Sequence, residues 1–303
     1  MRHTLTSACA ALAATLALSA SADGQATAAP ARPPTVDDLL ALRPVSDPSI
    51  SPDGRWIAYV VTRSDREKNV NNAVIWAVPA EGGTPVQLTR GPRADRAPQW
   101  APDGSWLAFL SDRRDDKKAQ VYGIVPNGGE AWPVTSVDGA VTSFRISPDG
   151  RHIAYVATPK ASKADEDLEK ERGRPIVRDS AYSSEWAQLW VAPLADRTAG
   201  AAQRSSPELL DVTSVEWAPD SRRLAWSAKP SPVLRYNTLS AVYIQDEPGA
   251  TPRKVSDMPG AETVVAWSPS LGLIVAATAN ALGTFNRKLW RVPETGGDRK
   301  RHV

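Results

Sequence analysis

Short apolar runs recur along the chain, and each follows the same kind of turn sequence. Four of the runs are Trp56–Val60, Trp106–Leu110, His152–Val156 and Arg223–Ser227, where apolar side chains alternate with polar ones or are continuous. This pattern predicts short β-strands separated by tight turns. Before each run stand an apolar residue, Ser or Ala, Pro, and a turn pair that is usually Asp-Gly. The five copies of this motif are Ile50–Gly54, Trp100–Gly104, Ile146–Gly150, Trp217–Ser221 and Trp267–Leu271.

The motif suits a type I turn, because proline fixes φ, Asp tolerates the next position and Gly takes the left-handed conformation. A second hairpin follows, as from Ile75–Pro79 through Gly82-Gly83 to Val86–Thr89, and it brings each repeat to four strands. The prolines recur roughly every 50 residues, apart from the longer interval between Pro148 and Pro219. Repeats of this kind form propeller blades. We therefore predict an all-β fold, a β-propeller of about five four-stranded blades.

Three segments depart from the repeat. Residues 35–42 predict a short N-terminal helix that Thr35 caps. The long interval comes from an insertion in the third blade, residues 158–186, whose opposite charges at i,i+4 spacing indicate a solvated excursion. In the last repeat the polar tail from Asp298 gives no convincing outer strand. We expect residues 35–303 to form an incomplete, open propeller.

The first 22 residues have the features of a secretory signal peptide. A basic start precedes the apolar stretch Leu5–Leu18, and Ala20-Ser21-Ala22 is an A-x-A site, so we expect cleavage after Ala22. Residues 23–34 are rich in Ala and Pro and are expected to be a disordered linker. Cys9 is the only cysteine and would leave with the signal, so the mature chain could form no disulfide. These features predict a periplasmic or secreted protein.

Charge and hydropathy narrow the range of partners. The chain has 36 Lys and Arg against 34 Asp and Glu, a formal net charge of +2. Such a small balance implies neither a nucleic-acid partner nor an anionic membrane surface. After the signal, no stretch approaches the ~18 apolar residues that a membrane-spanning helix needs.

Residues that carry hydrolytic or metal chemistry are scarce. Of three histidines, His3 lies in the predicted signal, His302 at the end of the chain and His152 at the start of a blade strand. No G-x-S-x-G sequence is present to place a nucleophile. The mature chain would have no cysteine and no paired His to ligate a metal. We expect no catalytic residue, cofactor or metal site here, and no activity of the chain alone.

Three features resemble the N-terminal part of the prolyl oligopeptidase family of serine peptidases. They are Thr35–Leu40, Ile50–Val60, and the Trp-x-Val-Pro…Gly-Gly hairpins. The likeness is to secreted bacterial dipeptidyl aminopeptidase and acylaminoacyl-peptidase-like members, and it covers residues 35–297. It implies a propeller that restricts access to a C-terminal α/β-hydrolase domain, which would lie beyond Val303.

The same resemblance singles out one candidate substrate contact. Some relatives bind the free N-terminus of a substrate through a pair of Glu residues that project from the propeller. Here the insertion ends with one Glu, Glu185, and no pair. Glu185 is therefore a candidate substrate-binding residue, and a surface or hinge role is the alternative.

Two functions remain open. The chain could be the substrate-gating propeller of a secreted serine peptidase that acts on peptides, without its catalytic domain. Alternatively, it could be a free-standing periplasmic propeller that binds a protein partner, similar to the propeller of the Tol system. Pairing of the last blade with the first would favour the second function, whereas an open ring with uncovered apolar faces would favour the first.

Overall fold

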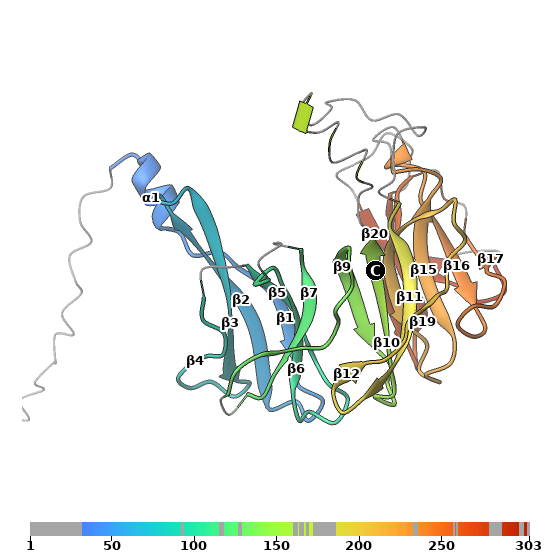
Figure 1. Cartoon of the computed structure of the whole chain (residues 1–303), viewed down its shortest axis with the longest axis horizontal. Helices are drawn as coiled ribbons and strands as arrows, with labels where there is room; N and C mark the ends of the chain where they lie inside the picture. Colours follow the sequence, from blue (N-terminus) through green and yellow to red (C-terminus); the bar gives the residue numbers. More distant parts are fainter. Residues whose placement is uncertain are drawn as a thin grey trace, which may run out of the picture. The chain divides into compact units, whose positions relative to one another are not determined.

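A computed structural model describes residues 32–301 of the chain (Figure 1). The description omits residues 92–93, 115–117, 127–128, 160–162, 164–166, 168–169, 172–185, 233–235, 257, 259, 279–286 and 297–299. The predicted signal peptide, residues 1–22, lies outside the described part. By its contacts the chain divides into two units, Met1–Leu39 and Leu40–Val303, and each is described separately below.

Helix α1 (Val36–Ala41) begins at the predicted cap. The Thr35 hydroxyl accepts a hydrogen bond from the Asp38 backbone N–H at 3.3 Å, and the Asp38 carboxylate accepts one from the Thr35 N–H at 2.7 Å. This reciprocal arrangement satisfies two of the free N–H groups at a helix start. Arg32 adds an ion pair to Asp38 at 2.6 Å. The short N-terminal helix is confirmed and ends one residue before the predicted end.

The second unit contains five antiparallel sheets, each built from strands that are consecutive in the sequence. Figure 1 labels most of these strands. The first sheet comprises β1 (Val45–Ile50), β2 (Trp56–Asp65), β3 (Val70–Pro79) and β4 (Val86–Gln87). The second comprises β5 (Asp95–Trp100), β6 (Leu107–Ser111), β7 (Gln120–Ile124) and β8 (Trp132–Pro133). The third comprises β9 (Ala140–Ile146), β10 (His152–Thr158), β11 (Gln188–Ala195), β12 (Thr198–Ala199) and β13 (Gln203–Arg204). The fourth comprises β14 (Asp211–Trp217), β15 (Leu224–Lys229), β16 (Ala241–Gln245) and β17 (Arg253–Lys254). The fifth comprises β18 (Glu262–Ser268), β19 (Gly272–Thr278), β20 (Arg287–Val292) and β21 (Lys300–Arg301).

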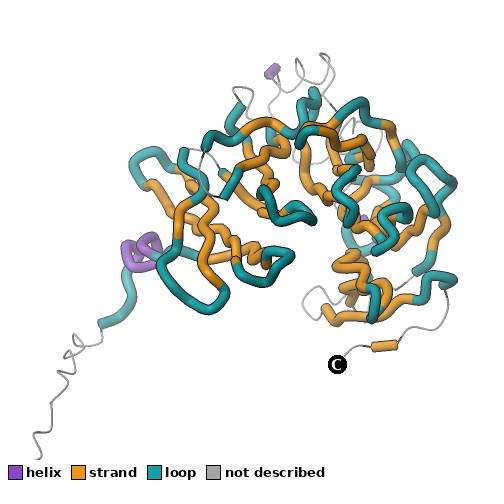
Figure 2. The backbone as a smooth tube through the Cα atoms, turned by 90° about the horizontal axis from the view of Figure 1, so that it is seen from below, coloured by secondary structure: helices purple, strands orange, loops and turns teal. Residues whose placement is uncertain are grey.

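The fold is therefore the predicted five-bladed β-propeller, with one blade for each copy of the turn motif. The strands of the blades are drawn in orange in Figure 2. The insertion predicted at residues 158–186 falls in the third blade, between β10 and β11, and most of its residues lie outside the described part. No helix in the described ranges combines the length and the apolar character needed to cross a bilayer.

In the first four blades the turn between the first two strands has the predicted geometry. In the first blade the Gly54 N–H donates to the Ser51 carbonyl at 2.8 Å, and Gly54 has φ +72°. The Ser51 hydroxyl also donates to the Asp53 carboxylate. In the fourth blade Ser221 occupies the left-handed position with φ 60°. In the fifth blade the glycine comes one residue later, and Gly272 has φ +73°.

The core lies between the blades. Four clusters of buried apolar side chains join the first blade to the second, the second to the third, the third to the fourth, and the fourth to the fifth. Among the described residues no such cluster, and no sheet, joins the fifth blade to the first. The predicted open propeller is confirmed.

One expectation about the last blade was wrong. The polar tail does supply an outer strand, because β21 pairs with β20 through Trp290 opposite Arg301 and Arg291 opposite Lys300. An outer strand of two residues needs only backbone hydrogen bonds, so its formation does not depend on apolar side chains.

Candidate functional site

The first strand of each blade is its innermost strand. These first strands contact the neighbouring blades, and they are β1, β5, β9, β14 and β18. In each of them a β-bulge shifts the register of pairing with the second strand. A bulge turns a side chain away from the regular alternation of a strand. In the last three blades the bulged residues Thr142, Thr213 and Val265 are exposed. Because propeller blades surround a central channel, these side chains are candidates to contact a molecule that passes along the inner strands.

An ion pair joins two of these inner strands. Arg145 on β9 donates to the Glu216 carboxylate on β14 at 2.8 Å, and both side chains are partly buried. Burial raises the pKa of Glu216, while the charge and the hydrogen bond of Arg145 oppose that rise. The pair therefore fixes a charged contact between the third and fourth blades beside the bulges.

A cavity of about 400 Å³ lies at the end of the blades where the insertion begins and returns. Tyr155 and Trp190, which are paired across β10 and β11, contribute its aromatic surface. Its remaining lining includes Thr158 and Pro159, at the start of the insertion, and Gln188 at its end. Burial raises the pKa of the Tyr155 phenol to about 12, so this group stays protonated at neutral pH. The volume suits a small ligand or one amino-acid side chain.

One wall of this cavity, residues 136–139, is hydrogen-bonded by the side-chain amide of Gln120 and also by Arg114 and Lys118. The Gln120 Nε2 group donates to the carbonyl of Val137 at 3.1 Å and to that of Gly139 at 2.9 Å. At Gly139 an added Cβ would lie 1.7 Å from the Thr158 carbonyl oxygen. Only glycine allows this wall to approach the base of the insertion so closely. The cavity wall at Gly139 therefore lies directly against Thr158, where the insertion begins.

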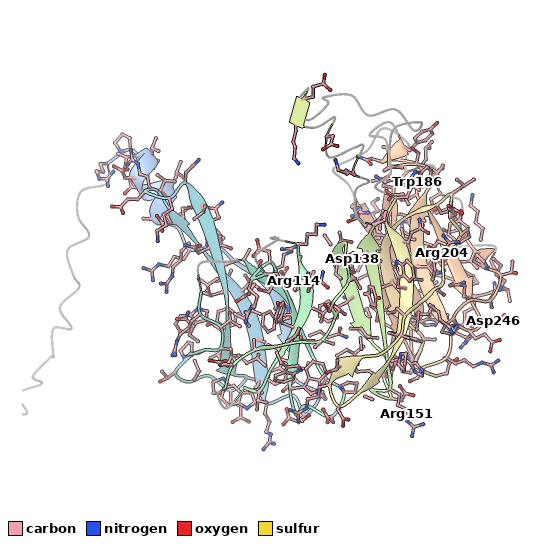
Figure 3. All side chains as sticks on the ribbon, viewed as in Figure 1. Arg114, Asp138, Arg151, Trp186, Arg204 and Asp246 are labelled. Carbon is pink, nitrogen blue, oxygen red and sulfur yellow. The ribbon has the colours of Figure 1, made fainter. Side chains whose placement is uncertain are left out.

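The return of the insertion is tethered to an inner strand. The Asp211 carboxylate at the start of β14 accepts the Ala187 N–H at 2.8 Å and pairs with Lys229 at 3.3 Å. Glu185, the candidate substrate contact, precedes Ala187 by two residues and lies outside the described part of the chain. Figure 3 shows Arg114, Asp138 and Trp186 toward this end of the blades, and Arg151 toward the other.

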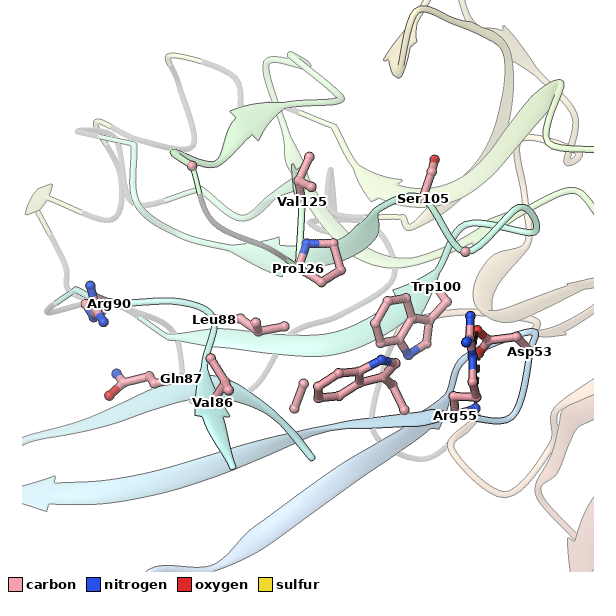
Figure 4. A pocket seen from close by; sticks show the side chains of 14 residues that line it. Asp53, Arg55, Val86, Gln87, Leu88, Arg90, Trp100, Ser105, Val125 and Pro126 are labelled. Atoms are coloured by element: carbon pink, nitrogen blue, oxygen red, sulfur yellow. Dashed lines mark hydrogen bonds and ion pairs between the residues drawn. The ribbon is translucent and has the colours of Figure 1, made fainter. Parts of the chain in front are cut away.

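A second cavity, of about 640 Å³, lies between the first and second blades (Figure 4). Its lining includes Leu88, Trp100 and the ion pair between Asp53 and Arg55, which are 2.7 Å apart. It is open to the turn motifs and to the outer strand β4, whereas the candidate contacts above lie on inner strands or at the insertion. We therefore place the candidate site at the insertion end.

The described part of the chain contains one histidine, at the start of β10. The imidazole of His152, the one described histidine, packs against Trp217 with ring centroids 6.2 Å apart, and its Nδ1 is buried without a hydrogen-bond partner. Within the same residues, no group of three His, Cys, Asp or Glu side chains is placed to hold a metal ion.

The sequence did not single out Arg145, Glu216 or the cavity. Arg145 and Glu216 each stand one residue before the apolar position of the turn motif, in consecutive repeats. Aligning the repeats would have placed the two opposite charges at equivalent positions of neighbouring blades. That alignment is the signal that could have found the pair.

Comparison with known proteins relates the chain to other propellers. Residues 43–187 match the TolB beta propeller domain family. Dipeptidyl-peptidase 5 of Porphyromonas endodontalis is 27% identical over 258 residues, which are 78% of this chain and 37% of that protein. The chain thus spans well under half the length of this relative.

Solved structures show the same fold. The acylaminoacyl peptidase of Pyrococcus horikoshii, in its orthorhombic crystal form, has a TM-score of 0.58 and 17% identity, over 87% of this chain and 40% of that one. The beta-propeller domain of the Trilobed protease from Pyrococcus furiosus, described as having an open velcro topology, has a TM-score of 0.54 and 14% identity, over 87% and 71%. The resemblance to the propeller portions of peptidases is confirmed.

Proposed function

We propose that this chain, a β-propeller related to the N-terminal propellers of prolyl oligopeptidase family peptidases, is the substrate-gating portion of a secreted serine peptidase that acts on peptides. The observation that supports this most directly is the similarity to a dipeptidyl-peptidase, which extends over 78% of the chain. The hydrolytic residues belong to an α/β-hydrolase domain outside these 303 residues.

The insertion end provides the peptide contacts in this proposal. The cavity beside Tyr155 and Trp190 accepts an apolar side chain of the peptide. Glu185, which precedes by two residues the Ala187 N–H bound to Asp211, forms an ion pair with the free amino group of the substrate. The exposed threonines of the bulges, Thr142 and Thr213, face the rest of the peptide along the inner strands.

A domain exchange tests the gating role. The chain replaces the propeller of the P. endodontalis dipeptidyl-peptidase 5, and cleavage of a dipeptidyl nitroanilide is compared with cleavage of a folded protein. Gating predicts that the chimera hydrolyses the small substrate and spares the protein, while the isolated chain hydrolyses neither. Release of nitroaniline by the isolated chain, or equal cleavage of both substrates by the chimera, would contradict the proposal.

Binding of peptides to the isolated chain tests Glu185. We expect a peptide with a free N-terminus to bind more tightly than its N-acetylated form, as measured by calorimetry. Glu185→Gln should abolish this difference, because the amide has no charge to pair with the amine. Glu208→Gln, at an exposed position outside the insertion, is the matched control and should preserve it. An unchanged preference in Glu185→Gln would rule out this contact.

Secretion forms part of the same proposal. Signal peptidase would cut after Ala22 and deliver the chain to the periplasm or the medium. Mass spectrometry of protein recovered from the periplasm should give a mature N-terminus at Asp23. Recovery of the intact N-terminus from the cytoplasm only would contradict it.

A second function is favoured by the match of residues 43–187 to the TolB propeller family. In that case the chain would bind a protein partner in the periplasm and need no hydrolase domain. Crosslinking in intact cells would then yield a stable protein complex, and the peptide preference assigned to Glu185 would be absent.

A further inference from the structure

The four interfaces between neighbouring blades share one chemical pattern. Each blade presents a leading face to the blade before it and a trailing face to the blade after it. On the leading faces, paired positions of the second and third strands hold large side chains, three of the four pairs being aromatic. These pairs are Phe109 with Tyr122, Tyr155 with Trp190, Trp226 with Tyr243, and Val275 with Trp290.

The trailing faces hold smaller side chains, mainly aliphatic, at the neighbouring positions of the same two strands. The corresponding pairs are Val60 with Ile75, Leu110 with Val121, Val156 with Leu189, and Ser227 with Val242. The buried clusters combine the trailing face of each blade with the leading face of the next. An aromatic pair therefore meets an aliphatic pair at three of the four internal interfaces, and at the fourth Val275 and Trp290 meet Ser227 and Val242.

The leading face of the first blade has the same chemistry but no cover among the described residues. Tyr59 and Trp76 are its aromatic pair, and both are only partly buried. Ile50, at the apolar position of the turn motif, is 66% exposed. Its four counterparts in the later repeats are no more than 7% exposed, namely Trp100, Ile146, Trp217 and Trp267.

The trailing face of the fifth blade likewise has no cover from the part of the chain that the structure describes. Ala276 and Leu289 are its pair, and Leu289 is 47% exposed. The four residues at the position of Leu289 in the earlier blades have no exposure, namely Ile75, Val121, Leu189 and Val242. Exposed apolar surface of this kind marks an interaction site.

We propose that these two faces bind each other between copies of the chain: the leading face of the first blade in one copy packs on the trailing face of the fifth blade in a second copy. The occupant is specified by the four internal interfaces, since each already packs a leading face on a trailing face. The contact joins two different surfaces and is therefore heterologous, so it builds closed rings or open chains rather than a symmetric pair.

Complementary variants test this arrangement by sedimentation. The wild-type chain should gain mass as its concentration rises. Ile50→Lys removes the leading face and Leu289→Lys the trailing face, so each alone should stay monomeric. Their mixture should form dimers and nothing larger, because the mixture retains one intact leading face and one intact trailing face. Both substituted positions are exposed, so each variant should fold, and circular dichroism checks that it does.

The control is Leu239→Lys, because Leu239 is 50% exposed and belongs to neither face. It should associate as the wild type does. The proposal is overturned if the wild type stays monomeric over the micromolar to millimolar range, if either face variant associates alone, or if the mixture fails to dimerise. Association of Leu289→Lys alone would indicate a symmetric contact between first blades instead.

Discussion

Gly123 on β7 lies directly against the indole ring of Trp132 on β8. A Cβ atom on residue 123 would stand 2.5 Å from Cε2 of that ring, well inside van der Waals contact. The two residues are opposite each other in the sheet, so the ring covers the glycine backbone. The indole also contacts Trp106, with ring centroids 5.8 Å apart, and the guanidinium of Arg197 in the next blade at 5.6 Å. Gly123 thus helps to position a side chain that joins two blades.

Gly123→Ala should destabilise the chain, because the new methyl group displaces Trp132 from both partners. We expect the free energy of unfolding to fall by about 1–3 kcal/mol, as for other overpacked sites. Urea denaturation followed by fluorescence measures this loss.

A double-mutant cycle provides the control for Gly123→Ala. In the Trp132→Ala background the ring is absent, so the same substitution should cost little. An equal loss in both backgrounds would show that the effect does not depend on the ring.

Arg145→Met should destabilise the contact between the third and fourth blades, because it leaves the carboxylate of Glu216 without its partner. We expect a loss of about 2 kcal/mol in the free energy of unfolding at pH 7. Arg151→Met, at an exposed position of the neighbouring turn, is the matched control and should stay within about 0.5 kcal/mol of wild type.

The loss from Arg145→Met should depend on pH. Burial already raises the pKa of Glu216 above its unfolded value of 4.5, and removal of Arg145 raises it further. A raised carboxyl pKa means that the folded state binds the proton more tightly, so stability falls as pH rises through that window. Urea denaturation at pH 4 and pH 7 should therefore show a smaller loss at pH 4. A loss that is equal at both values would contradict this origin.

The blades could be predicted from the sequence because their signals are local. The turn at Ser51–Gly54 depends on proline, Asp and Gly within a few residues. The helix cap is equally local, because it joins Thr35 to Asp38 three residues later. The pairing of Arg145 with Glu216 spans 71 residues. It depends on how one blade packs against the next, so the signal appears only when consecutive repeats are aligned and not within a single repeat.

The last blade contains a strand that the sequence pattern did not predict. Asp298 begins a polar tail, and polarity suggested that no outer strand would form there. Its short outer strand, Lys300–Arg301, nevertheless pairs with the neighbouring backbone. The candidate site could be predicted from the sequence only in part. Glu185 came from a family resemblance, whereas the cavity beside Tyr155 arises only from the packing of the blades.

The turn aspartates should make the free energy of unfolding depend on pH in the acid range. Although burial opposes the change, hydrogen bonds from the Ser147 hydroxyl and the Arg151 N–H lower the pKa of Asp149 below 3.8. A lowered pKa contributes stability above the unfolded value, and this contribution is lost as pH falls through the folded one. Asp149→Asn should therefore be less stable than wild type at pH 7, by less than about 1 kcal/mol because the carboxylate is exposed.

The difference between wild type and Asp149→Asn should disappear as the pH is lowered below 3.8, since the wild-type carboxyl then also becomes neutral. Thermal unfolding across this range measures it. Asp246→Asn, at another exposed position, is the control for the loss of one negative charge. A difference that persists in acid would show that Asn disturbs the turn itself.

Thr135 links the stability of the second blade to the cavity at the insertion end. Its buried hydroxyl accepts the Val121 N–H at 2.9 Å and donates to the Gln120 side-chain oxygen at 3.1 Å. The amide of Gln120 in turn holds the cavity wall through Val137 and Gly139. Thr135→Val should leave a buried N–H without an acceptor and cost about 1–3 kcal/mol.

Thr135→Ser retains the hydroxyl and should recover most of this loss. Because Thr135→Val also removes one of the hydrogen bonds that fix the Gln120 side chain, it should weaken peptide binding at the insertion end more than Thr89→Val does. Thr89 accepts the equivalent bond from the Ile75 N–H in the first blade, at 2.9 Å, but lies away from the cavity. Calorimetry with one peptide compares the two variants at a temperature where both are folded. Equal binding by the two would show that Gln120 does not transmit the change from Thr135 to the cavity wall.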